Sequence, residues 1–295
     1  MADHAVFKLL SAVFLVLGVT FSAWAAPPRN APKVAVSIKP LHSLIAGVME
    51  GLGTPSLIIK GTASPHAFVL KPSDAATLNR AHLTFWVGPG LEASLSKALE
   101  ALSGRAYVIG LAATTMMGLP PKPSEGELHF WLDPGKARAV VAIAVAQLGA
   151  LDPTNAFQYR ANGQRVSLRI DYLERLLFNK LSPLRNIPFL VYHNAYGHLA
   201  RAYNLKMVGA VATHPETPPS ARRMSELRKI IDQGGVRCLF QEPQFNSRPG
   251  YALIDGTNVR TGFLDPMGGA LDPGPDLYFQ MMEINAESLS NCLGK

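Results

Sequence analysis

The chain has 295 residues, of which 48% are hydrophobic and 17% are charged, so it is long and apolar enough for two ordinary folded domains. Its net charge is +7, but Lys and Arg are scattered and no basic run is longer than Arg222-Arg223. This distribution favours an ordinary solvated surface over a basic surface for nucleic acid or an acidic membrane.

The first residues have the pattern of a secretory signal peptide. Lys8 precedes an apolar run from Leu9 to about Thr20, and Ala23-Trp24-Ala25 provides a cleavage site of small residues. The run is shorter than the ~20 residues that a spanning helix needs, which disfavours the alternative of an N-terminal membrane anchor. We therefore expect residues 1–25 to be removed and the mature protein to be exported.

The first part of the mature chain alternates strands with helices. Each expected strand is a short apolar run that ends at Pro, Gly or a polar turn. The expected strands lie at 35–40, 56–60, 83–88 and 106–111, and the expected helices at 41–50, 75–81 and 91–102. Such alternation predicts βαβ units and a parallel sheet.

From Asp133 the pattern becomes helical over a long stretch. Asp133 as N-cap and Pro134 as first residue begin a helix to about Gly149. Asp152-Pro153 restarts the helical pattern, which continues to about Leu181 with its apolar residues on one face. We interpret this second segment as a rigid strut.

Alternation of strands and helices then resumes. The expected strands lie at 188–193, 206–212, 237–243 and 259–265, and the expected helices at 194–204, 220–233 and 275–292. The sequence thus predicts an α/β protein of two lobes, each with a mainly parallel sheet flanked by helices, joined by one long rigid helix. The expected boundaries are 26–150 for the N-terminal lobe, 151–183 for the connecting helix and 184–295 for the C-terminal lobe.

Three histidines and one carboxylate lie at loop or strand-end positions that are far apart in the sequence. His66, His129, His193 and Asp265 each stand beside a break rich in Pro, Gly or aromatic residues. Three imidazoles and one carboxylate form a four-coordinate set of the type that zinc prefers. Taken singly, each has an ordinary alternative, namely a surface or backbone-bonded histidine, or a turn cap for Asp265.

Other polar residues are weaker candidates for this site. Glu242 follows a predicted strand and could accept the second N–H of a ligating imidazole, or play an ordinary turn or ion-pair role. His198 is expected to be a surface or packing residue, and His214 lies in a loop whose direction the sequence leaves open. The chain has no H-E-x-x-H, G-x-S-x-G or phosphate-binding loop motif, so we expect no catalytic activity.

Cys238 and Cys292 are the only cysteines. In an exported protein two cysteines usually form a disulfide, whereas a role as metal ligands is disfavoured in an oxidising compartment.

At these residues the chain resembles the periplasmic zinc-uptake solute-binding proteins of the ABC type, the ZnuA-like family often called cluster A-I. The resemblance covers nearly all of the mature chain. It is carried by the segments SPHAFVLKPSD, LHFWLDP, VYHNAYGHLARAYNL, CLFQEPQF and GFLDPMGG.

The resemblance implies that Zn(II) binds in a cleft between two lobes, held by His66, His129 and His193, and that Cys238 pairs with Cys292. It also implies delivery of the ion to an ABC permease at the inner membrane by a monomeric protein. The fourth ligand varies in the family, and here Asp265 is expected, with water as the alternative.

The segment before His129, PPKPSEGE, is short and lacks the histidine-rich loop of many zinc members. Three nitrogen ligands favour zinc over manganese. A manganese- or iron-binding member of the same family is the first alternative, and an exported zinc-dependent hydrolase with Glu242 as base is the second. An adhesin or metal chaperone on the same scaffold is a third.

Overall fold

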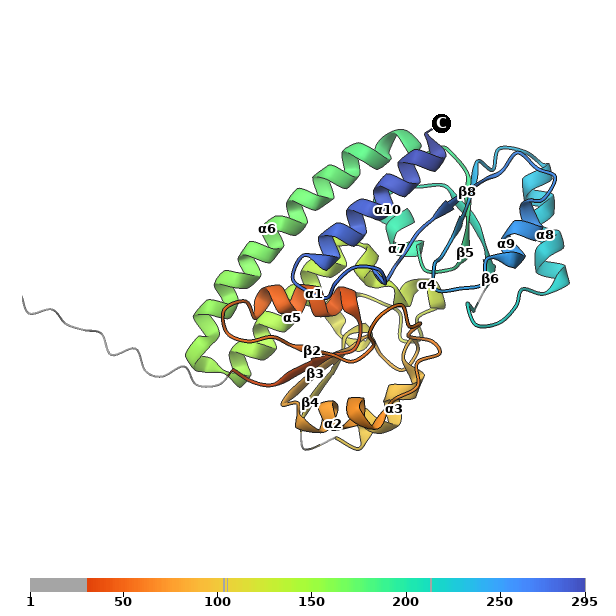
Figure 1. The fold of residues 1–295 in the computed structure, drawn as a ribbon. Coiled ribbons are helices and arrows are strands. Elements are labelled where there is room, and N and C mark those ends of the chain that lie inside the picture. The colour runs from red at the N-terminus through yellow and green to blue at the C-terminus, as the bar shows by residue number, and fades with distance from the viewer. Residues whose placement is uncertain (1–30, 103, 105, 213, 295) are drawn as a thin grey trace, which may run out of the picture.

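The computed structural model describes residues 31–102, 104, 106–212 and 214–294, so the expected signal peptide lies outside the described residues. Two four-stranded sheets form the molecule, with strand orders β2-β1-β3-β4 and β6-β5-β7-β8. Every strand pair is parallel, which confirms the predicted fold class. Figure 1 shows the two sheets at opposite ends of the molecule, with long helices running along one side of both.

The first sheet comes from the N-terminal part of the chain. Its strands are β1 (Val34–Val36), β2 (Ser56–Leu57), β3 (Leu83–Trp86) and β4 (Tyr107–Gly110), and the helices between them are α1 (Lys39–Val48), α2 (Pro72–Arg80) and α3 (Ala93–Glu100). β2 is shorter than predicted. Ile58 and Ile59 still donate backbone hydrogen bonds to Val36 and Ser37, so the apolar run beyond β2 remains attached to the sheet.

The second sheet repeats this arrangement. Its strands are β5 (Phe189–His193), β6 (Met207–Ala212), β7 (Cys238–Gln241) and β8 (Arg260–Phe263), and its helices are α7 (Gly197–Tyr203), α8 (Ala221–Asp232) and α9 (Arg248–Ile254). The chain passes outward from β5 to β6 and then returns to β7. The carboxyl ends of β5 and β7 therefore form the switch point at which ligands of such sheets usually bind.

Of the remaining helices, three lie between the two sheets in the chain and the fourth follows the last strand. They are α4 (Glu125–Leu128), α5 (Pro134–Leu151), α6 (Ala156–Leu181) and α10 (Leu277–Leu293). The side chain of Asp133 accepts a hydrogen bond from the Gly135 N–H at 2.7 Å, as expected for the predicted cap of α5. In the part of the chain that the structure describes, none of the helices has both the length and the apolar character that a membrane crossing requires.

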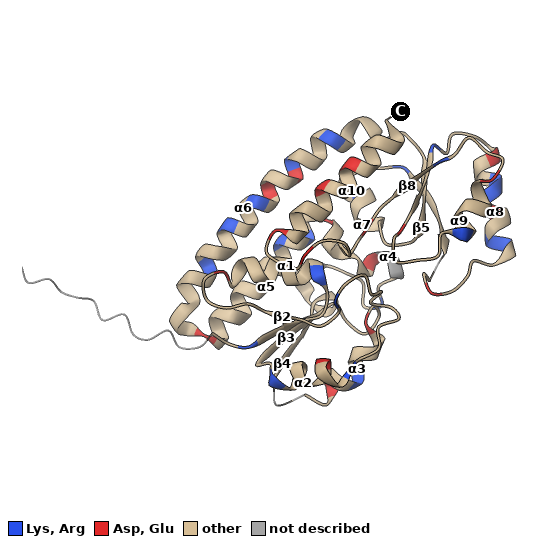
Figure 2. Ribbon diagram, viewed as in Figure 1, with Lys and Arg blue, Asp and Glu red and all other residues tan. Residues whose placement is uncertain are grey.

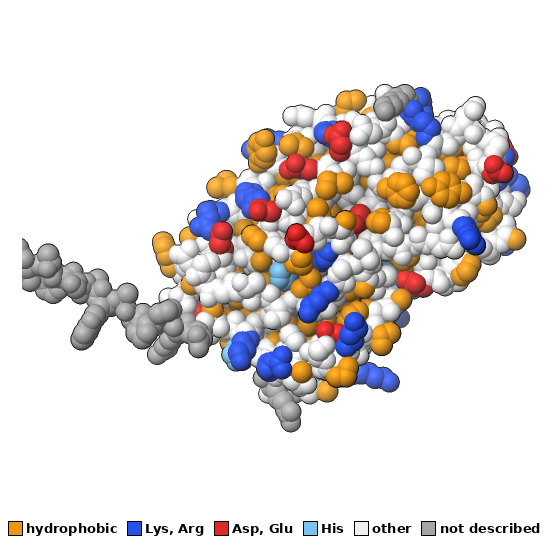
Figure 3. Space-filling model, in the orientation of Figure 1, with side chains coloured by type: hydrophobic (Ala, Val, Ile, Leu, Met, Phe, Trp, Pro, Cys, Tyr) orange, Lys and Arg blue, Asp and Glu red, His pale blue; other side chains and the backbone are white. Residues whose placement is uncertain are grey.

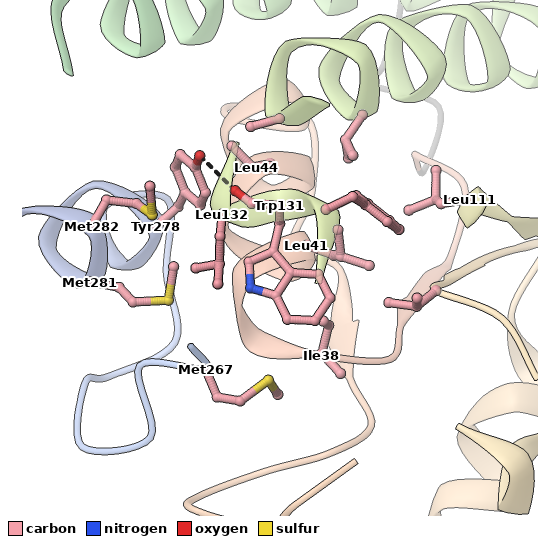
Figure 4. Close-up of a cluster of buried hydrophobic side chains, with 14 of the residues drawn as sticks. Ile38, Leu41, Leu44, Leu111, Trp131, Leu132, Met267, Tyr278, Met281 and Met282 are labelled. Carbon is pink, nitrogen blue, oxygen red and sulfur yellow. Dashed lines mark hydrogen bonds between the residues drawn. The ribbon is translucent and has the colours of Figure 1, made fainter. Parts of the chain in front are cut away.

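The two halves share a core. One cluster of buried apolar side chains extends from the first sheet through α1, α5, α6 and α10 to the second sheet. Figure 4 shows part of it, where Trp131 and Leu132 lie among side chains of α1 and α10. There the Tyr278 hydroxyl donates to the Trp131 carbonyl at 2.9 Å. A large apolar interface of this kind restricts independent movement of the two halves.

A disulfide joins Cys238, the first residue of β7, to Cys292 in α10, as predicted. It links the second sheet directly to the helix that packs against α6 and α1.

The charged residues are dispersed over the surface. Figure 2 shows basic and acidic residues interspersed along the outer side of α6, and Figure 3 shows the same mixture on one face of the whole molecule. Arg165 pairs with Glu50, Arg169 with Asp276 and Lys180 with Glu287. Exposed pairs of this kind contribute little to stability.

Glu92 gives the fold a pH dependence that can be measured. Its carboxylate is fully buried and accepts the N–H groups of Val87 and Gly88 at 2.8 and 3.1 Å, and burial raises the pKa of Glu92 to about 7. A carboxyl whose pKa is raised in the folded state favours folding at low pH, so this contribution is lost as pH rises from about 5 to 8. Glu92→Gln should remove about 3 kcal/mol of that pH dependence, measured by urea unfolding at several pH values. Identical profiles for the two proteins would contradict the assignment.

Candidate metal centre

The three predicted histidines meet in space. His66 lies in the loop between β2 and α2, His129 lies between α4 and the turn that precedes α5, and His193 is the last residue of β5. His129 and His193 are buried, each only 1% exposed, and His66 is half-buried. One nitrogen from each ring can be chosen so that all three nitrogens lie within 4.8 Å of one another.

The ring spacings match those of imidazoles that share one ion. The ring centres lie 5.6 Å apart for His66 and His129, 5.3 Å for His66 and His193, and 4.9 Å for His129 and His193. With Zn–N bonds of about 2.0–2.1 Å and tetrahedral angles, two bound imidazole centres lie about 5 Å apart. The three rings are therefore arranged so that a single cation fits among them without a large rearrangement.

A small cavity lies at this meeting point. It offers about 10 Å³ to the centre of a water-sized particle, roughly the space for one water or ion. Residues of both halves line it, namely Ser64, Pro65, His66, His129, His193, Glu242, Gln244, Phe245, Pro266 and Met267.

Glu242 lies directly behind His193. It follows β7 at the switch point of the second sheet, and its Oε1 accepts the Nδ1–H of His193 at 3.0 Å. Both side chains are 1% exposed. Burial raises the pKa of Glu242, while the neighbouring His193 opposes that shift. The hydrogen bond fixes the ring orientation of His193, and a carboxylate partner of this kind is usual for a ligating histidine.

The structure does not bring Asp265 into the group of three histidines. Both of its carboxylate oxygens accept hydrogen bonds, mainly from the loop that follows. Oδ1 accepts the Met267 N–H at 2.9 Å and the Gln244 side-chain N–H at 2.6 Å, and Oδ2 accepts the Gly269 N–H at 2.6 Å. In this structure the carboxylate caps a turn, so Asp265 as fourth ligand stays a prediction, with water as the alternative.

The other histidines have separate surroundings. The Nε2 of His198 bonds to the Glu127 carbonyl at 3.0 Å in a buried position, so His198 is a packing residue. His214 is exposed, and its ring centre lies 5.5 Å from that of His66. Its direction, which the sequence left open, is thus toward the rim of the site.

Comparison with known proteins agrees with this geometry. Residues 34–292 match the family described as the periplasmic zinc-uptake complex component A. The chain is 35% identical to the high-affinity zinc uptake system protein ZnuA of Brucella suis over 306 aligned positions, which cover 89% of this chain and 92% of the relative. It is 30% identical to the protein of the same name from Paracoccus denitrificans, with 95% and 98% covered.

Solved structures share the fold. The periplasmic zinc-binding protein TroA of Treponema pallidum superposes with a TM-score of 0.80 at 22% identity, covering 89% of this chain and 99% of TroA. A ZnuA deletion mutant with zinc bound superposes with a TM-score of 0.76 at 25% identity, covering 90% and 98%. With a family match across most of its length, this chain belongs to the family of periplasmic zinc-uptake complex component A proteins.

Proposed function

We propose that this protein captures Zn(II) with His66, His129 and His193 and delivers it to an ABC permease at the inner membrane. The observation that supports this most directly is the spacing of the three rings, which is that of imidazoles around one ion. Relatives that cover about nine-tenths of the chain are named as zinc-uptake proteins, and a structural neighbour holds zinc. The signal-like N-terminus supports export to the periplasm.

The chemistry of the donors favours zinc over manganese. Three imidazole nitrogens suit zinc, whereas manganese prefers oxygen ligands, and the carboxylate of Asp265 is engaged elsewhere. Glu242 contributes negative charge through His193 without occupying a coordination position. The fourth position of the ion is then left for water.

A site with three protein ligands and one water suits a carrier. The water can be exchanged for a ligand of the receiving protein, so the ion can leave without first breaking a closed tetrahedral shell. The same open position would suit a hydrolase, but a hydrolase needs a base beside the metal-bound water. Glu242, the sequence-based candidate for that base, already binds His193. We therefore propose a binding protein, monomeric as its family suggests, without catalytic activity.

A competition titration tests this function. Purified apo-protein should bind one equivalent of zinc, and manganese at a hundredfold excess should displace little of it, measured with a chromophoric chelator. Displacement by equimolar manganese would contradict the choice of metal, and absence of zinc binding would contradict the function itself. Hydrolysis of ester or peptide substrates by the zinc-loaded protein would favour the enzyme instead.

A further inference from the structure

A loop of the second half covers the metal cavity. Residues 265–271, here called the covering loop, follow β8, and Pro266 and Met267 line the cavity. Asp265 organises the start of this loop by accepting the N–H groups of Met267 and Gly269. The loop is thus a formed turn whose first residues line the cavity beside the three histidines.

A lysine from the first half holds the covering loop. Lys39, at the start of α1, is 3% exposed, and its Nζ donates to the carbonyl oxygens of Gly269 at 2.6 Å, Leu271 at 2.9 Å and Gly268 at 3.3 Å. An ammonium group has three N–H donors, and three carbonyls meet them. Burial lowers the pKa of Lys39, and the nearby carboxylates of Asp265 and Asp272 oppose this shift.

A second contact attaches the same loop at its beginning. The indole N–H of Trp131 donates to the Pro266 carbonyl at 2.7 Å in a buried position. Figure 4 shows the Trp131 indole between side chains of α1 and Met267. Trp131 is two residues from His129, so one short segment of the first half supplies both a proposed ligand and an attachment for the loop.

We propose that Lys39 is a positioning residue that holds the covering loop closed over the ion and so sets how fast the ion leaves. This proposal rests on the proposed function, since the ion is the zinc bound by the three histidines. The loop can open without a wide rotation of the two halves, whose shared core resists such rotation. Without the ammonium group, three carbonyls would lie buried without their donor, and an open, hydrated loop would become more favourable.

Replacing Lys39 by Met tests the proposal, because Met fills a similar volume without donors. Zinc dissociation, followed by stopped flow with excess chelator, should be about tenfold faster than in the wild type, while association changes little. Lys136→Met is the matched control, because Lys136 donates to the Met117 carbonyl within the first half alone. Equal dissociation rates for Lys39→Met and the wild type would overturn the proposal, as would an equal acceleration by both variants.

Hydrogen exchange provides a second readout, and its zinc-dependent part uses the wild type alone. Because coupling between loop and ion is reciprocal, zinc should slow exchange of the Gly269 amide in the wild type. Unchanged exchange in the zinc-loaded protein would overturn the role of the loop. If the wild type binds no zinc, the proposed function fails, and the contact of Lys39 is still tested. In that case Gly269 should exchange faster in apo Lys39→Met than in the apo wild type, and equal rates would refute the contact.

Discussion

Replacing His129 by Ala should weaken zinc binding by two to three orders of magnitude. Structural zinc sites have apparent binding free energies of about 10–16 kcal/mol, so one of four ligands accounts for roughly 3–4 kcal/mol. His129 is buried, and its ring packs against Trp131 with centres 5.1 Å apart, so the imidazole is held in place before the ion arrives. The affinity is measured by competition with a chelator of known zinc affinity.

The matched control for this change is His82→Ala. His82 is exposed, its Nδ1 accepts the backbone N–H of Lys33, and it does not line the cavity. Its removal should leave zinc affinity unchanged. Thermal unfolding of both variants shows whether each is folded. Wild-type affinity in a folded His129→Ala protein would refute the assignment of this ligand.

The second large effect is expected at Glu242. Glu242→Gln keeps the size of the side chain but removes the charge that faces the Nδ1–H of His193. Loss of such a partner usually lowers metal affinity by about 10–100-fold, and we expect a decrease in this range. The same chelator competition measures it.

Glu92→Gln is the control for Glu242→Gln, because Glu92 is an equally buried carboxylate that binds backbone N–H groups and does not line the metal cavity. Glu92→Gln should alter the pH dependence of folding stability but leave zinc affinity unaltered. If both variants lose affinity equally, the effect comes from general destabilisation, and Glu242 has no special role.

Much of the fold could be predicted from the sequence because its strands are short apolar runs separated by clear helical patterns. Helix α9 was not predicted. Its Pro249-Gly250 pair is typical of a turn, yet Pro249 occupies the first turn of a helix, where its missing N–H costs nothing. The long connecting helix was predicted from its periodicity, and α6 indeed runs from Ala156 to Leu181.

The site could be predicted in part. His193 and Glu242 both follow strands, and since β5 and β7 are neighbours, their carboxyl ends meet. Asp265 also follows a strand, and the backbone N–H groups of its own loop bind its carboxylate, which is the turn-cap role that the sequence had left open beside ligation. No pattern in the sequence pointed to a role for Lys39 at the site, because the carbonyl groups that accept its hydrogen bonds lie about 230 residues further along the chain.

Anomalous diffraction at the zinc edge, on crystals loaded with one equivalent of zinc, tests the shared-ion arrangement most directly. A single peak should lie about 2.0–2.1 Å from one nitrogen each of His66, His129 and His193. A zinc peak elsewhere, or one bound by fewer than two of these imidazoles, would contradict it.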